Sequence, residues 1–227
     1  SKGMRPHTRP KAMSLDDIKE TQKEFVQAAI NAIDAGFDGV ELHAANGYLL
    51  EQFLRPSSNQ REDEYGGDIE GRARFLLEVA DQCIAAIGKE KVGMRLSPYG
   101  VFNDMTVYDE TEEEYTWLTD RLNELGLAYL HIVDHSSMGA PEVPDSIKKM
   151  FRAHFDGTLI LSGGYTVERA EFDLISGKAD LIAVGRGFLA NPDLVERWRS
   201  GAELNEPDMD TFYTPGSEGY TDYPTLG

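Results

Sequence analysis

Apolar residues along the chain follow two alternating patterns, one helical and one extended. Ile18, Phe25, Ala29 and Ile33 recur at helical spacing, which predicts a helix capped by Ser14 and ended by a glycine. Four later segments predict helices, at about 70–87, 111–125, 145–154 and 166–176. Short apolar runs between them predict strands at 39–43, 92–97, 129–133, 159–162 and 181–184. A last helix is expected to begin at Asn191-Pro192, where a capping residue precedes proline.

Regular alternation of strand and helix predicts an α/β fold with parallel strands that are buried on both faces. A complete (β/α)8 TIM-type barrel needs eight strands, and the pattern supplies five, with a helix before the first. An open sheet is the alternative. We favour an incomplete barrel because residues 1–14 have the composition of a mid-domain loop. The expected organisation is a loop or linker at 1–14, a partial barrel at 15–200, and an irregular tail at 201–227 lining the barrel mouth.

Polar side chains gather directly after the first predicted strand. His43, Asn46 and Tyr48 lie within six positions, at the start of a long loop that extends to about residue 69. Strand ends followed by polar loops are where α/β barrels place their chemistry. We therefore expect a functional site here, although a strand-end histidine and an anchoring tyrosine also occur as structural residues.

Two glycine turns follow the last two predicted strands, Gly163-Gly164 and Gly185-Arg186. In barrels this place commonly holds a phosphate on backbone N–H groups, while a tight strand-to-helix connection is the simpler explanation of each turn. Arg95 lies inside an otherwise apolar strand, where a charge is costly unless it is paired. A partner for Arg95 is therefore implied.

Composition narrows the function classes. The chain of 227 residues has a formal net charge of −18, which disfavours nucleic acid and anionic membranes as partners. The single cysteine, Cys83, excludes an internal disulfide, fits a reducing cytoplasm and has the apolar neighbours of a buried helix residue. His131, Asp134 and His135 lack a further ligand cluster, so we predict no metal site.

Several runs in the same order resemble the old yellow enzyme family of flavin-dependent ene-reductases. The matching runs are 39–54, 58–67, 72–75, 94–98, 185–186, 191–193 and 219–224. The resemblance implies an FMN-binding (β/α)8 barrel that takes hydride from NADPH or NADH and reduces electron-poor alkenes. It places this chain at barrel strands four to eight and leaves the first three strands without counterparts. Gly71 stands where the family usually has asparagine in a Glu-Asn-Arg triplet.

The resemblance also implies roles for individual residues. His43 and Asn46 would hydrogen-bond the carbonyl or nitro oxygen of the substrate, and Tyr48 would protonate its α-carbon. Arg95 would lie at the flavin N1/O2 edge, with an ion pair to Glu41 as the structural alternative. The remaining assignments put Gly163, Gly164, Gly185 and Arg186 at the FMN phosphate, and Phe102 and Tyr220 in the substrate pocket.

Two other functions compete with this interpretation. One is a non-catalytic half-barrel that has lost FMN and associates through exposed strand edges, with a second copy or a complementing N-terminal segment as its partner. The other is a related flavin barrel acting on dienoyl-CoA thioesters, which the single cysteine excludes because those proteins carry an iron–sulfur cluster.

Overall fold

A computed structural model describes residues 9–227 of the protein. They form two compact units, one of Met13–Ile182 and one of Ala183–Gly227 together with residues 9–12.

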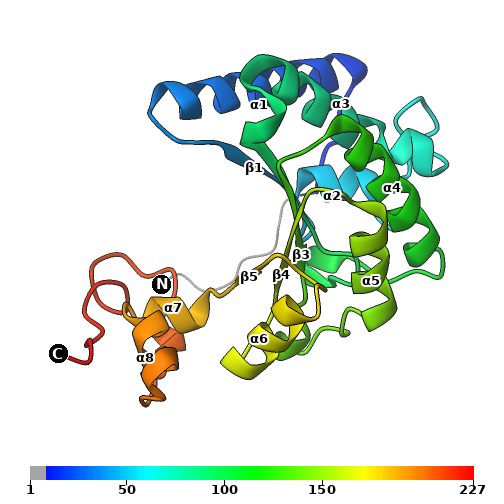
Figure 1. The fold of residues 1–227 in the computed structure, drawn as a ribbon. Helices are drawn as coiled ribbons and strands as arrows, with labels where there is room; N and C mark the ends of the chain where they lie inside the picture. Colours follow the sequence, from blue (N-terminus) through cyan, green and yellow to red (C-terminus); the bar gives the residue numbers. More distant parts are fainter. Residues whose placement is uncertain (1–8) are drawn as a thin grey trace. The chain divides into compact units, whose positions relative to one another are not determined.

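The larger unit alternates strands and helices (Figure 1). Its strands are β1 (Val40–Ala44), β2 (Val92–Leu96), β3 (Tyr129–Val133), β4 (Thr158–Ser162) and β5 (Leu181–Ala183), the last of which ends at the unit boundary. Its helices are α1 (Leu15–Asp34), α2 (Leu49–Leu54), α3 (Ile69–Ile87), α4 (Thr111–Leu125), α5 (Asp145–His154) and α6 (Val167–Ile175). The single-turn 3₁₀ helices are η1 (Lys89–Lys91), η2 (Phe102–Asp104) and η3 (Ser136–Met138).

The five strands form one sheet in chain order, β1-β2-β3-β4-β5, and the pairs from β1 to β4 are parallel. Helices α1, α3, α4 and α5 line the same side of the sheet in Figure 1. A doubly wound sheet would reverse its strand order and carry helices on both faces, whereas a barrel is wound in one direction. The fold is therefore that of an incomplete (β/α) barrel, as the sequence predicted.

Alternate strand residues build the core beneath these helices. The buried positions include Leu42, Ala44, Met94, Leu96, Leu130, Ile132, Leu159 and Leu161. The residues between them on the opposite face, His43, Arg95, His131 and Ile160, are only partly buried. The expectation that the strands are buried on both faces is wrong for these positions, because the helices cover one face of the sheet.

Helix caps explain why the helices begin where the sequence predicted. Ser14 Oγ accepts from the backbone N–H of Asp17 at 3.1 Å, and Asp17 Oδ2 accepts from Ser14 N–H at 2.8 Å, forming a capping box. Thr166 caps α6 through the N–H of Arg169. Cys83 is fully buried in α3, as expected, and burial raises its pKa to about 11.

The long loop after β1 differs from the prediction because it contains helix α2. Leu50, Phe53 and Leu54 are buried on one side of this helix, at the spacing of a helical turn. Only six residues long, α2 lacks the two or three turns over which apolar periodicity identifies a helix in a sequence.

The smaller unit contains α7 (Arg186–Ala190), α8 (Leu194–Ser200) and the 3₁₀ turn η4 (Met209–Thr211). The expected helix start at Asn191-Pro192 is wrong. Asn191 ends α7, and its side chain donates to Gly187 O at 3.0 Å and accepts from Asn205 N–H at 2.7 Å. Asp193 stands at the N-cap of α8 and binds Arg197 Nε at 2.8 Å.

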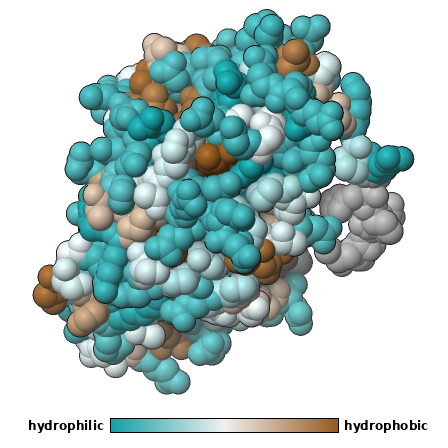
Figure 2. Space-filling view, turned by 90° about the vertical axis from the view of Figure 1, so that its right-hand side faces the viewer, coloured by the Kyte–Doolittle hydropathy of each residue, from teal (hydrophilic) through white to brown (hydrophobic). Residues whose placement is uncertain are grey.

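Hydrophilic residues cover most of the face seen in Figure 2, which is viewed from the side of α4 and α5 in Figure 1. Across residues 9–227, no helix combines the length and apolar character needed to cross a membrane.

Candidate active site

The segment after β1 is a tight turn that leads into α2. Asn46 and Gly47 both take left-handed backbone conformations, with φ of +60° and +72°. A Cβ on Gly47 would lie 2.6 Å from Asn103 Cβ and 2.7 Å from Phe102 O, so glycine is required there. Tyr48 occupies the N-cap position of α2 and is half exposed.

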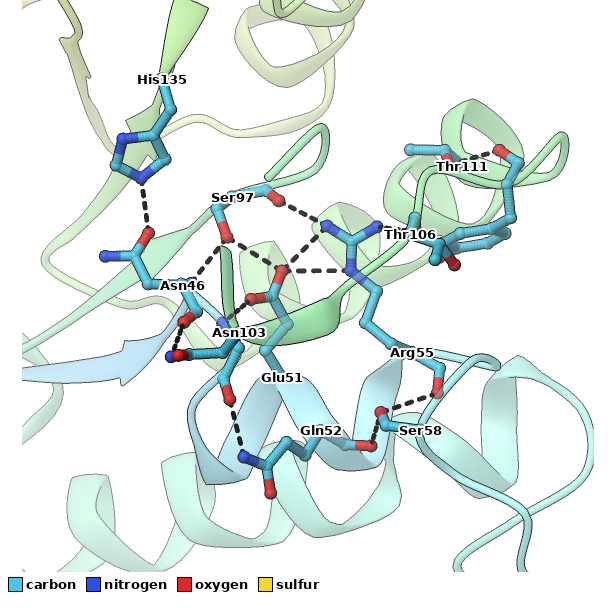
Figure 3. A network of polar contacts seen from close by, with 12 residues as sticks. Asn46, Glu51, Gln52, Arg55, Ser58, Ser97, Asn103, Thr106, Thr111 and His135 are labelled. Atoms are coloured by element: carbon cyan, nitrogen blue, oxygen red, sulfur yellow. Dashed lines mark hydrogen bonds and ion pairs between the residues drawn. The ribbon is translucent and has the colours of Figure 1, made fainter. Parts of the chain in front are cut away.

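A buried carboxylate from α2 holds this turn (Figure 3). Glu51 Oε2 accepts from the N–H of Gly47 at 2.6 Å, and Glu51 Oε1 accepts from Ser97 Oγ at 2.9 Å. The same Ser97 Oγ accepts from the N–H of Asn46 at 2.8 Å. Glu51 therefore binds the turn directly and also through the residue that follows β2.

Arg55 neutralises Glu51 from the next turn of α2. Its Nε and Nη2 lie 3.1 and 2.9 Å from Glu51 Oε1, and both side chains are fully buried. Nη2 also donates to Ser97 O at 2.6 Å. Burial alone lowers the pKa of Arg55, but Tyr115 and Glu51 outweigh this and raise it, so the arginine stays charged.

A row of polar side chains crosses the face of the sheet opposite the helices. The strand register sets His43 beside Arg95, and Arg95 beside His131. Two residues earlier in each strand, the Tyr129 ring lies over Gly93, where an added Cβ would come within 2.2 Å of the ring. This glycine lets Tyr129 reach across toward Glu41.

Glu41 binds His131 in this row. Its Oε2 lies 3.0 Å from His131 Nδ1, and His131 Nε2 lies 3.0 Å from Ser162 Oγ. Burial raises the pKa of Glu41, but the hydrogen bond and charge of His131 outweigh it, and the net pKa is lowered. The Glu41 carboxylate, which sequence reasoning considered as a partner of Arg95, instead lies within hydrogen-bond distance of His131.

Arg95 has a nitrogen without a partner. Its Nε is buried and makes no hydrogen bond within the described chain. A buried donor of this kind costs free energy unless a ligand accepts from it. Arg95 therefore fits the requirement for a group that binds an electron-rich edge, as a flavin would present.

His43 lies next to Tyr48, with ring centroids 5.1 Å apart. Burial lowers the pKa of His43, and the neighbouring Arg95 lowers it further. At neutral pH His43 is therefore an uncharged hydrogen-bonding group. Asn46, from the same turn, binds His135 across the end of the sheet through its Oδ1, 2.7 Å from His135 Nε2.

The first glycine turn follows β4. Gly163 and Gly164 have φ of +120° and +62°, and a Cβ on Gly163 would lie 2.0 Å from Asp134 O. Asp134 is itself buried and bound to Lys148 Nζ at 2.9 Å. This close packing explains the glycine at 163 and leaves backbone, rather than side chains, at the strand end, which is compatible with a phosphate.

The structure brings four of the predicted site residues together. His43, Asn46, Tyr48 and Arg95 share the carboxyl end of β1 and β2. Phe102 lies in η2 and is 55% exposed. Gly185, Arg186 and Tyr220 belong to the smaller unit, where Gly185 and Arg186 begin α7 and the Tyr220 hydroxyl accepts from Tyr213 N–H at 2.7 Å.

Sequence reasoning missed Glu51, Arg55, Ser97 and His135. The available signal was a charged pair at i and i+4, Glu51 and Arg55, among the apolar residues of the 49–54 segment. His135 was considered only as a metal ligand with His131 and Asp134, because its partner Asn46 is 89 residues away in the sequence.

Comparison with known proteins decides the family. The sequence profile of the NADH:flavin oxidoreductase / NADH oxidase family matches residues 2–205. The chain belongs to this family. The match confirms the resemblance to old yellow enzymes seen in the sequence.

Members of the family resemble the chain over most of its length. A probable flavin mononucleotide-dependent alkene reductase of Leishmania infantum is 46% identical, covering 97% of this chain and 60% of that protein. Among solved structures, morphinone reductase is 45% identical with a TM-score of 0.94, covering 99% of this chain and 60% of its own. The old yellow enzyme homologue of Zymomonas mobilis is 39% identical with a TM-score of 0.92, covering 99% and 64%. The chain thus spans about three fifths of the length of these family members.

Proposed function

We propose that the protein is an FMN-dependent oxidoreductase that reduces electron-poor alkenes such as enones, with NADPH or NADH as the reductant. When bound, FMN would supply the hydride chemistry at the β-carbon of the alkene. The observation that carries the proposal is the buried, unpartnered Nε of Arg95, one strand away from His43. A donor in that place suits the N1/O2 edge of a flavin, where negative charge collects on reduction. Family membership supports the same cofactor.

His43 and Asn46 would bind the substrate oxygen. Uncharged His43 offers a ring N–H, and Asn46 offers its amide N–H groups, both from the end of β1. Two donors aimed at one carbonyl or nitro oxygen stabilise the negative charge that develops there as the β-carbon is reduced.

Tyr48 would supply the proton. The phenol O–H bond breaks, the proton goes to the substrate α-carbon, and water later returns a proton to the phenolate. Its half-exposed side chain beside His43 is compatible with this exchange. In the larger unit, Phe102 would line the substrate pocket, and Gly163 and Gly164 would offer backbone N–H groups to the FMN phosphate. The roles that the sequence implies for Gly185, Arg186 and Tyr220, which belong to the smaller unit, stay predictions.

The test is to purify the protein, saturate it with FMN, and follow NADPH oxidation without oxygen in the presence of 2-cyclohexenone. We expect flavin to remain bound after gel filtration and the enone to be reduced. Tyr48→Phe should leave flavin reduction by NADPH unchanged and slow the alkene step about 100-fold or more. A protein that neither retains FMN nor reduces the enone would contradict the proposal.

The second candidate is a non-catalytic half-barrel. Strands β1 and β5 lie at the two edges of the sheet in the described chain, and exposed edges invite pairing with a second copy or with a complementing segment. Light scattering coupled to size exclusion, together with a flavin absorbance scan, separates the two functions. A colourless, uniform oligomer favours the half-barrel, and a yellow protein favours the enzyme.

The proposal also covers the binding partners of the protein and its location in the cell. A net charge of −18 disfavours nucleic acid as a partner, and a small electron-poor alkene is the ligand that the site suits. The single buried Cys83 is consistent with a cytoplasmic protein, which fractionation of cells would test.

A further inference from the structure

The backbone of Asn46 is held at both of its polar groups. Its N–H donates to Ser97 Oγ at 2.8 Å, and its carbonyl accepts from Asn103 Nδ2 at 2.9 Å. The left-handed φ of +60° is one that few side chains other than asparagine adopt readily. With the main chain fixed, the remaining freedom of this residue is the rotation of its carboxamide.

His135 restricts that rotation. The ring reaches from the end of β3 to the Asn46 amide in Figure 3, and its Nε2 lies 2.7 Å from Asn46 Oδ1. A carboxamide oxygen can only accept a hydrogen bond, so His135 Nε2 must carry the hydrogen. Rotating the amide by half a turn would set its NH₂ group against that N–H and lose the bond.

The segment that carries His135 is anchored independently of Asn46. Asp134 Oδ1 accepts from Ser136 N–H at 2.9 Å, and Asp134 Oδ2 binds Lys148 Nζ at 2.9 Å with both side chains buried. The carbonyl of His135 accepts from Met138 N–H at 2.8 Å. The backbone that carries the His135 ring is thus held by its own loop.

We propose that His135 is a positioning residue that sets the polarity of the substrate-oxygen site. By holding Asn46 Oδ1, it leaves the two N–H groups of Asn46 Nδ2 to donate to the oxygen of a ligand. The site then selects alkenes whose activating group is a hydrogen-bond acceptor, such as a carbonyl or nitro oxygen. This inference rests on the proposed function, because it assigns a specificity determinant to that same site.

The decisive variants differ in what they present to Asn46. His135→Gln keeps a side-chain donor, and we expect kcat/KM for cyclohexenone to stay within about threefold of the original protein. His135→Glu presents only acceptors, so the amide should turn over and face the substrate with its oxygen. We expect kcat/KM to fall at least about tenfold, with the rate of flavin reduction by NADPH unchanged.

A double-mutant cycle shows whether the effect passes through Asn46. In the Asn46→Ala background, His135→Glu should cause no further loss. Met138→Glu, which adds the same charge three residues away on a side chain that is 60% exposed, is the control and should match the original protein. The proposal would be overturned if His135→Glu lowered kcat/KM equally in the original and Asn46→Ala backgrounds. It would also be overturned if His135→Glu left kcat/KM unchanged in the original background.

A readout independent of turnover separates this inference from the proposed function. Nitrogen-15 NMR of the purified whole protein should show the His135 ring protonated at Nε2, with signals that move in Asn46→Ala. A ring protonated at Nδ1 alone, or one indifferent to Asn46→Ala, would refute the inference even if the enzyme reduces enones. Conversely, the protein could show the expected ring signals and still fail to reduce enones. That result would refute the proposed function and leave the His135–Asn46 interaction established.

Discussion

Arg95 is a guanidinium on a strand face that also presents His43 and His131, and its Nε is buried without a partner. A residue of this kind is a cost to the folded chain by itself, because a buried donor has lost water and gained nothing in return. The cost is recovered when a ligand accepts from it. The proposed role of Arg95 in flavin binding would give this donor its acceptor.

This role predicts that one substitution of Arg95 weakens FMN binding without lowering the stability of the flavin-free protein. Arg95→Met should weaken FMN binding at least about tenfold, which corresponds to about 1.4 kcal/mol. The urea midpoint of the flavin-free protein should stay constant or rise, because an unsatisfied buried donor is removed. Flavin fluorescence titration and urea unfolding measure the two effects. Lys23→Met, in an exposed pair on α1, is the control and should change neither.

A lowered pKa of His43 predicts a pH dependence of stability. Burial and Arg95 depress the pKa of this residue in the folded state, while in the unfolded chain it titrates near 6.5. Below that pH the unfolded chain binds the proton more readily, so the free energy of unfolding falls as pH drops through that value.

Urea unfolding at about pH 7.5 and about pH 5.5, on either side of the usual histidine pKa, tests this prediction. We expect the original protein to lose more stability between the two values than His43→Gln, which has no titrating ring. Equal losses in both proteins would show that His43 is not the group responsible.

At the scale of elements, the short helix α2 is bonded to the turn before it. Glu51 of α2 accepts from the N–H of Gly47 in the turn, and Arg55 neutralises Glu51. Glu51→Gln should lower the free energy of unfolding by about 3–5 kcal/mol, because it leaves the Arg55 charge buried and unpaired. Chemical denaturation measures the change. Glu20→Gln removes an exposed partner of Lys23 on α1 and should cost no more than about 1 kcal/mol. Comparable losses in the two variants would mean that Glu51 is not essential to the turn.

The packing around Gly47 in this turn predicts that its substitution by alanine costs more stability than the same substitution at Gly67, which has a similar φ. Gly47→Ala combines a left-handed φ of +72° with contacts of 2.6 and 2.7 Å at the added Cβ. It should cost about 2–4 kcal/mol. Gly67→Ala has φ of +79° but nothing within 4 Å, so it should cost about 1 kcal/mol from backbone strain alone. Thermal unfolding of both variants measures the difference, and equal losses would show that the close packing at Gly47 yields without cost.

For the whole molecule, the dominant electrostatic fact is an excess of acidic residues, 40 against 22 lysines and arginines. Mutual repulsion of like charges destabilises a folded chain, and salt screens it. We expect the thermal midpoint to rise when NaCl increases from about 20 mM to about 300 mM, a range over which the screening length shortens severalfold. KCl at matched ionic strength should act alike, and a midpoint that falls with both salts would contradict this view.

The sequence by itself determined the five strands, the helices of the larger unit other than α2, and the type of fold. Apolar periodicity placed the five strands within a residue or two, and local capping residues such as Ser14 and Thr166 set the helix starts. These features depend on residues a few positions apart, so they can be recognised without a structure. Strand and helix alternation then predicted a barrel, and the strand order confirms it. The motif runs pointed to the family before the fold was known.

Only the tertiary structure decided which polar groups meet. Glu41 binds His131, 90 residues away, because β1 and β3 both pair with β2 in a register that puts the two side chains on the same face of the sheet. Asn46 binds His135 because the ends of β1 and β3 lie on the same edge of one sheet. Such pairings depend on how distant segments pack, and a change of one residue in strand register would turn each side chain to the opposite face. The pattern of hydrophobic residues along the chain does not indicate which distant polar groups the strand register brings together.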